Sequence, residues 1–149
     1  MTEVWFYQLR FKPLEQVLPA LLEKTRERGW RAVVQAASTE RLEAIDQALW
    51  TYRDESFLAH GTDRDGHPEL QPIWLTTGDD NPNSADIRLL VDGADAATAD
   101  GYQRIIHIFD GDDEVATEAA RETWKRMKAG AHVISFYQMT DTGHWQKKA

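Results

Sequence analysis

Three basic residues, Arg121, Lys125 and Lys128, follow one another at intervals of four and three positions, and an aromatic residue, Trp124, lies among them. On a helix, residues at i, i+4 and i+7 share one face. Cationic groups beside a large aromatic ring suit an acidic, extended peptide, because the cations hold carboxylates and the ring holds an apolar side chain. The spacing therefore predicts a peptide-binding surface, provided that this segment is helical.

The distribution of charge supports this interpretation without settling it. Residues 121–149 contain six Lys and Arg against two Asp and Glu, whereas residues 1–120 contain 11 against 23, so that the chain as a whole carries −8. An acidic protein is a poor general binder of nucleic acid, so we expect contact with DNA to be indirect. Two alternatives stay open: a solvated basic face with Trp124 in the core, and single-stranded DNA stacked on Trp124.

The remaining residues with reactive or metal-binding side chains form no catalytic or metal-binding motif. No glycine-rich phosphate loop follows a predicted strand, the five histidines are scattered, and there is no cysteine. Turn formation and helix capping account for the carboxylates at 110–113. We therefore predict no enzyme activity, no cofactor and no metal. The alternative is a small α/β nucleotide-binding or hydrolytic enzyme with an unrecognised site.

The elements that would position the basic residues follow from hydrophobic periodicity. Helices are predicted after Pro13, after Ser38 and over 114–129, the last with an apolar face. The residues expected on that face are Val115, Ala116, Ala119, Ala120 and Met127. A long loop is expected over 51–72 and a short polar tail after the last strand. The predicted strands are 3–9, 31–36, 73–76, 87–91, 104–109 and 132–139.

Alternating strands and helices predict an α/β fold: a Rossmann-like open sheet, mostly parallel, with helices on both faces. A length of 149 residues is typical of one domain, here 1–149. No apolar run is long enough to cross a bilayer, the amino terminus does not resemble a secretory signal, and cysteine is absent. We therefore expect a cytoplasmic protein without a membrane partner.

Several motifs resemble the chi subunit family of bacterial DNA polymerase III. Residues 42–60 contain Ile45-Asp46-Gln47-Ala48-Leu49-Trp50 and then Ser56-Phe57-Leu58-Ala59-His60, similar to the family pattern [LI]-D-x-A-L-W…S-F-x-x-H. The opening Phe6-Tyr7-Gln8-Leu9 is similar to the family's F-Y-x-L strand, and Asp86-Ile87 resembles the start of its central strand. Ala120-Arg121-Glu122-Thr123-Trp124-Lys125 resembles its A-R-E-x-[YW]-K helix.

The resemblance implies a non-catalytic accessory subunit of the clamp loader, with a Rossmann-like fold that binds no nucleotide. Such subunits grip the acidic C-terminal tail of single-stranded DNA-binding protein, and Arg121, Trp124 and Lys125 match the tail-binding motif. Lys128 is added from helix geometry alone. Thr117 occupies a position where the family can carry another basic residue.

The resemblance also implies a second partner, the psi subunit or a helicase-like protein. Trp50 and Phe57 match the positions that meet this partner. The alternative for both residues is an ordinary place in the hydrophobic core.

Overall fold

The structure, a computed structural model, describes residues 2–51, 59–94, 101–130, 133–142 and 144–148. The helices are α1 (Leu14–Glu27), α2 (Thr39–Trp50), a short 3₁₀ helix η1 (Pro68–Leu70) and α3 (Glu114–Lys128). The strands are β1 (Glu3–Leu9), β2 (Ala32–Gln35), β3 (Ile73–Thr76), β4 (Ile87–Val91), β5 (Arg104–Asp110), β6 (Val133–Met139) and β7 (Trp145–Lys147).

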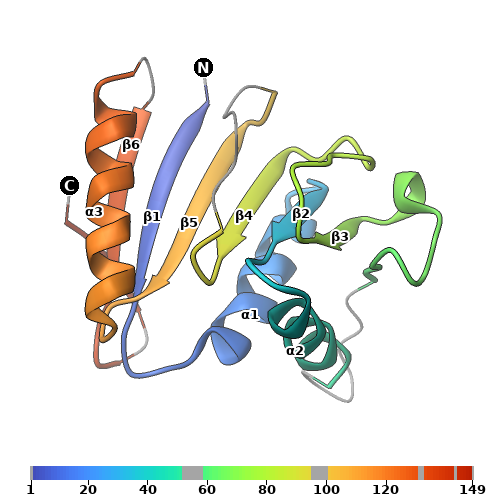
Figure 1. Cartoon of the computed structure of the whole chain (residues 1–149), viewed down its shortest axis with the longest axis horizontal. Helices are drawn as coiled ribbons and strands as arrows, with labels where there is room; N and C mark the ends of the chain where they lie inside the picture. The colour runs from blue at the N-terminus through green and yellow to red at the C-terminus, as the bar shows by residue number, and fades with distance from the viewer. Residues whose placement is uncertain (1, 52–58, 95–100, 131–132, 143, 149) are drawn as a thin grey trace.

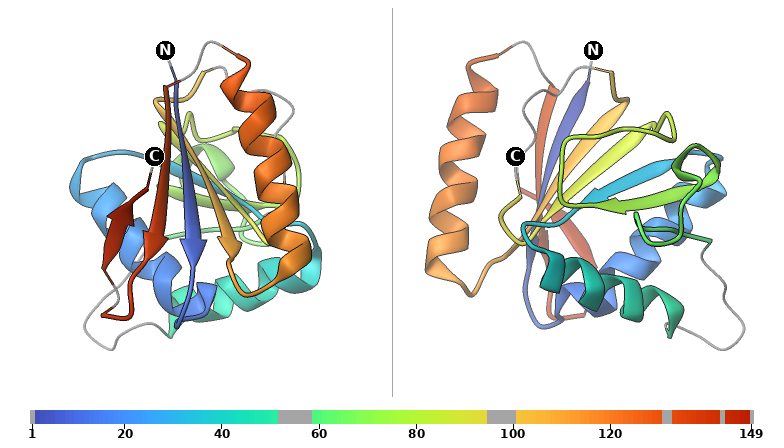
Figure 2. Two further views of the ribbon diagram at one scale, coloured as in Figure 1. Left: turned by 90° about the vertical axis from the view of Figure 1, so that its left-hand side faces the viewer. Right: turned by 45° about the vertical axis from the view of Figure 1, so that its right-hand side comes forward.

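The described strands form a single open sheet in the order β3-β2-β4-β5-β1-β6-β7. Figure 1 labels this series from β3 to β6. Every neighbouring pair is parallel except β6 and β7, which are antiparallel. Helices α1 and α2 lie against one face and α3 against the other (Figure 2). The predicted fold class, a mostly parallel Rossmann-like sheet with helices on both faces, is confirmed.

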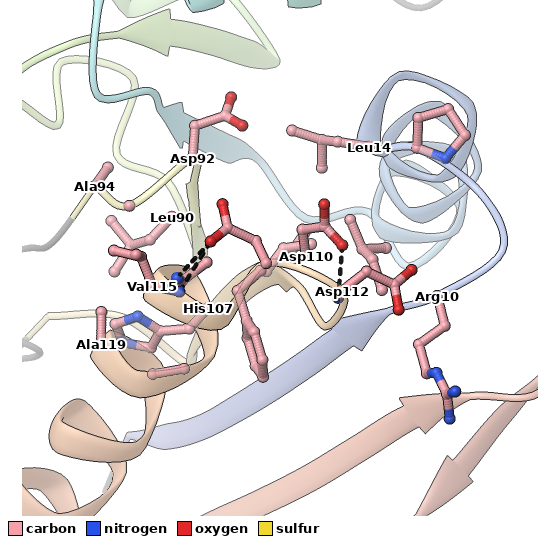
Figure 3. Close-up of a pocket in the computed structure, with 18 of the residues that line it drawn as sticks. Arg10, Leu14, Leu90, Asp92, Ala94, His107, Asp110, Asp112, Val115 and Ala119 are labelled. Atoms are coloured by element: carbon pink, nitrogen blue, oxygen red, sulfur yellow. Dashed lines mark hydrogen bonds between the residues drawn. The ribbon is translucent and has the colours of Figure 1, made fainter.

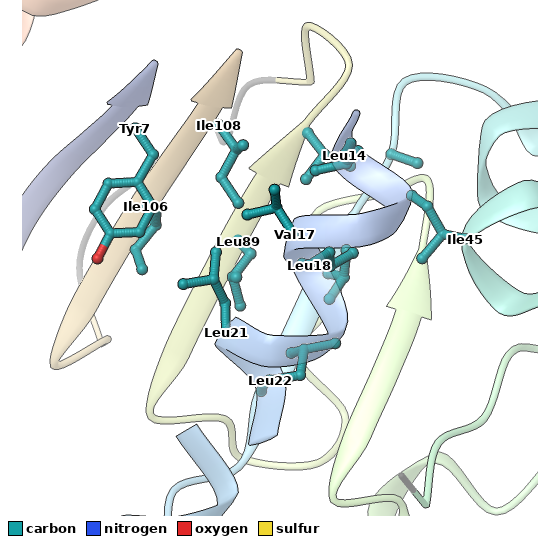
Figure 4. Close-up of a cluster of buried hydrophobic side chains, with 14 of the residues drawn as sticks. Tyr7, Leu14, Val17, Leu18, Leu21, Leu22, Ile45, Leu89, Ile106 and Ile108 are labelled. Carbon is teal, nitrogen blue, oxygen red and sulfur yellow. The ribbon is translucent and has the colours of Figure 1, made fainter. Parts of the chain in front are cut away.

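The face under α1 and α2 carries the main hydrophobic core (Figure 4). Helix α1 begins after Pro13 and buries an apolar stripe that includes Leu18 and Leu22, which meet strand residues such as Leu89. The spacing of three and four residues brings this stripe to one side of the helix. Pro19 lies inside α1 and is buried with the stripe.

Both α2 and α3 begin at a residue that caps the helix with its side chain. The Ser38 hydroxyl accepts a hydrogen bond from the Arg41 backbone N–H at 3.2 Å. One carboxylate oxygen of Asp113 accepts from the backbone N–H groups of Val115 and Ala116 at 2.9 and 3.1 Å. These bonds satisfy amide groups that have no partner within the helix, and they fix where α3 starts.

Two features of the carboxyl-terminal part differ from the predictions. The expected polar tail contains β7, because Trp145 stacks on Tyr7 with ring centroids 4.3 Å apart and draws the chain back onto β6. The expected core face of α3 is wrong at Val115, which is 80% exposed, and at Ala119, which is also exposed. No described residue of α3 is fully buried. Small alanine side chains on α3 leave the helix lightly packed, as the cleft described below shows.

None of the described helices combines the length and the apolar character needed to cross a lipid bilayer.

Candidate partner-binding surfaces

The basic stripe, defined as Arg121, Lys125 and Lys128, lies on the exposed side of α3. Arg121 and Lys125 have side chains 70% and 72% exposed, and each approaches a glutamate one turn earlier, Glu118 or Glu122, at 3.7 Å. Exposed pairs of this kind contribute little, and an incoming carboxylate can replace the glutamate. Lys128 lies in the last turn, where the helix dipole favours positive charge.

Trp124 anchors α3 to the sheet instead of standing free between the cations. Its ring packs edge-on against Phe6 of β1 at 5.5 Å and against Phe136 of β6 at 5.9 Å. The side chain is partly buried. The alternative that placed Trp124 in the core therefore describes its packing, while the exposed stripe beside it is also present. Because Trp124 is only partly buried, part of this residue stays accessible to solvent.

The two flanks of α3 are chemically different. Helical geometry places the basic stripe and Trp124 on the flank that faces β6. The opposite flank presents Val115, Ala119 and Thr123 to a cleft over β4 and β5. Thr117 points towards the preceding loop, where its hydroxyl donates to the Gly111 carbonyl at 3.4 Å. Threonine is uncharged, so Thr117 adds no positive charge to the basic stripe.

The cleft lies at the carboxyl ends of β1, β4 and β5 and has a volume of about 1020 Å³. In open parallel sheets this edge is where nucleotides bind. Figure 3 shows Asp92, Asp110 and Asp112 along one part of it and Leu90, Val115 and Ala119 along another, with Arg10 extending away. The nearby amides of α3 are already held by its own capping carboxylate.

One of the basic residues that line this cleft, Arg41, is already paired with carboxylates. Arg41 contacts Glu15, and its Nε donates to the Asp92 carboxylate at 2.9 Å. Burial works to raise the pKa of Glu15, but hydrogen bonds from the backbone and from Arg41, with the guanidinium charge, outweigh it and lower that pKa. The cleft thus surrounds a paired arginine with additional carboxylates, an environment that disfavours phosphate.

A second surface surrounds Trp50 at the end of α2, where this residue is 48% exposed. The core alternative is therefore wrong for Trp50, whereas Phe57 lies outside the described residues. The centroids of the Trp50 and His60 rings lie 4.5 Å apart, and the His60 side chain is fully buried. His60 Nε2 in turn lies 2.9 Å from the Asp46 carboxylate. Sequence reasoning missed this support, although Asp46 and Trp50 are separated by one helical turn.

Fold and surface together define a class: a Rossmann-like α/β protein with an acidic cleft at the usual ligand edge and a helix on one face that carries a basic stripe. Comparison with known proteins narrows this class. Residues 1–135 match the family described as "DNA polymerase III chi subunit, HolC". The chain belongs to the DNA polymerase III chi subunit family, a family of replication accessory subunits.

One curated relative is the "Probable DNA polymerase III subunit chi" of Rickettsia prowazekii (strain Madrid E). It is 29% identical over 89 residues, which amount to 60% of this chain and 54% of the relative. The aligned segment therefore spans about half the length of that relative.

Proposed function

We propose that the protein is a non-catalytic accessory subunit of the DNA polymerase III holoenzyme that links the clamp loader to single-stranded DNA-binding protein. The link would be the acidic C-terminal tail of that protein, gripped by Arg121, Lys125 and Lys128 with Trp124 beside them. The observation that carries the proposal is the basic stripe, exposed on α3 in an otherwise acidic chain of a chi-family protein. Contact with DNA would be indirect, and the site of action cytoplasmic.

Because the charges of the basic stripe are exposed and those of Arg121 and Lys125 are already paired, we expect binding of the tail to be weak and sensitive to salt. Carboxylates of the tail would displace Glu118 and Glu122 from the basic side chains, so that each new pair replaces an existing one. The exchange gains little per pair, and several pairs with an apolar contact are needed for useful affinity. Exposed charges are also screened within about 10 Å at 0.1 M salt.

A labelled peptide ending in Asp-Asp-Ile-Pro-Phe tests the proposal by fluorescence anisotropy. The full chain should bind it with a Kd on the order of micromolar, weakening as salt rises. Lys125→Glu should reduce affinity at least tenfold, while Lys24→Glu, an exposed lysine on α1, should leave it within about twofold. Absence of binding at low salt, or equal loss in both variants, contradicts the proposal.

The second proposed partner, the psi subunit or a helicase-like protein, would dock at Trp50 and Phe57. An exposed tryptophan with a supported ring is the residue type that dominates protein interfaces. Trp50→Ala should abolish co-elution with purified psi subunit while the acidic peptide still binds. Leu70→Ala, which removes another exposed apolar side chain, is the matched control. Co-elution of the Trp50→Ala variant would move this interface elsewhere.

The alternative of a nucleotide-binding enzyme predicts a different result. A ligand at a hundred times its Kd stabilises a protein by about 2.7 kcal/mol. We expect no thermal shift with ATP, GTP or NAD, because carboxylates line the cleft. A shift that disappears in an Arg10→Ala or Lys12→Ala variant would favour the enzyme alternative. Single-stranded oligonucleotide should likewise bind less tightly than the peptide, and tighter binding would favour direct DNA contact.

A further inference from the structure

Strand β7 lies beyond the part of the chain that matches the chi family, which ends at residue 135. It pairs antiparallel with the end of β6, with Tyr137 opposite Lys147 and Met139 opposite Trp145. Two lysines, Lys147 and Lys148, therefore come to the outer edge of the sheet at β6. They complete the group of six basic residues in the last 29 positions.

The pairing register of β6 and β7 places the side chains of these two lysines on opposite faces of the sheet. Lys147 is opposite Tyr137, whose ring packs on Tyr7 within the face covered by α1. The Lys148 backbone N–H donates to the Phe136 carbonyl at 2.8 Å, which places Lys148 opposite Phe136. Residues directly opposite one another project to the same side of a sheet. Lys148 is therefore on the α3 face, beside Phe136, and Lys147 is not.

Phe136 connects this lysine to the proposed peptide surface. Its ring lies 5.9 Å from the ring of Trp124, on the flank of α3 that carries the basic stripe. Cationic groups thus come from two segments, α3 on one side of Phe136 and Lys148, the residue directly after β7, on the other. Lys148 is exposed, and no ion pair joins it to a carboxylate in the described part of the chain.

We infer that β7 forms a second wall of the acidic-peptide surface and that Lys148 is a charged contact for the peptide. The inference rests on the proposed function, because it names a further residue of the same surface. An extended acidic peptide lying over Phe136 and the edge of Trp124 would have Arg121 and Lys125 on one side and Lys148 on the other. Charge complementarity selects this occupant: the surface supplies cations from both sides.

The two adjacent lysines provide a matched experiment. Lys148→Glu and Lys147→Glu change the net charge equally, at exposed neighbouring positions, but on opposite faces. By anisotropy with the labelled acidic peptide at low salt, Lys148→Glu should weaken binding about five- to tenfold, and Lys147→Glu by less than about twofold. Lys148→Gln should show an intermediate loss and a shallower dependence of affinity on salt.

The possible results distinguish a failure of the proposed function from a failure of the proposed role of Lys148. If the unmodified chain does not bind the peptide, the proposed function itself fails. If it binds, and Lys125→Glu weakens binding while Lys148→Glu and Lys147→Glu behave alike, the contribution of β7 is overturned and the stripe on α3 stands. Should either reversal unfold the protein, as judged by circular dichroism, the pair Lys148→Gln and Lys147→Gln decides by the same criterion.

Discussion

The two faces of the sheet are built in different ways. Under α1 and α2, leucine, isoleucine and valine side chains form one continuous buried cluster. Under α3 the buried apolar residues are divided, with aromatic contacts of Trp124 at one side and two small clusters at the other. This face also carries the cleft and a buried arginine, Arg88, which contacts Tyr102 beside the two small clusters. The first face stabilises the fold, whereas the second presents the basic stripe that we expect to bind an acidic peptide.

The difference shows why a lightly packed helix suits an interaction surface. Helix α3 needs only Trp124 and a few small residues to hold it on the sheet, which leaves most of its side chains exposed. Substitutions on its outer side should therefore alter binding with little effect on stability, and substitutions under α1 should do the reverse.

The largest expected effect comes from a substitution in the hydrophobic core under α1. Leu22 is fully buried, so Leu22→Ala should lower the free energy of unfolding by about 2–5 kcal/mol through lost burial and the cavity left behind. Val115→Ala, an exposed position on α3, should change it by less than about 0.5 kcal/mol. Urea unfolding followed by circular dichroism measures both. Equal costs would show that the two faces are not different in kind.

The next largest effect on the free energy of unfolding concerns Arg88, a buried charged residue on the α3 face. The Arg88 guanidinium donates to the Gln35 side chain, to the Tyr102 hydroxyl at 3.0 Å and to backbone carbonyls of Gly78 and Asp80. Arg88→Met would leave these acceptors without their donor and should cost about 2–3 kcal/mol in the same urea assay. A Gln35→Ala variant should cost less, because the remaining acceptors keep their donor. A neutral Arg88→Met would contradict this account of the face.

The smallest expected effect depends on pH and concerns Tyr7, which is buried on the face covered by α1 and α2. Burial, followed by the nearby Tyr137, raises the pKa of Tyr7 from 10.0 to about 12. The folded state therefore holds the phenol proton more tightly, so its contribution is complete below pH 10 and is lost as the pH rises towards 12. Relative to Tyr7→Phe, the unmodified chain should lose about 1.4 kcal/mol of stability between pH 9 and pH 11. Parallel losses in the two proteins would rule out this burial of the phenol.

Much of the fold follows from the sequence, because hydrophobic spacing and capping residues act locally. The stripe of α1, the Ser38 cap and the Asp113 start of α3 are of this kind. The exposure of Val115 was not predictable, because helical periodicity shows a face but not how closely the sheet approaches it. Strand β7 was missed because three residues are too few for a pattern, and a distant ring, Tyr7, holds it in place.

The candidate site was predictable only in part. The positions of Arg121, Lys125 and Lys128 on one helix followed from spacing, whereas the packing of Trp124 on Phe6 and Phe136 depends on strands far apart in the chain. The support of Trp50 by His60 and Asp46 likewise depends on contacts between α2 and a residue that lies outside this helix. Tertiary contacts of this type leave no local periodicity in the sequence.

The central claim is that the exposed side of α3 binds acidic peptide without contributing to the fold. The most direct measurement pairs the anisotropy of the labelled acidic peptide with urea unfolding for the double variant Arg121→Glu, Lys125→Glu. We predict an affinity loss of at least about fiftyfold, with the free energy of unfolding changed by less than about 1 kcal/mol. Unchanged affinity in a stable double variant would contradict the claim.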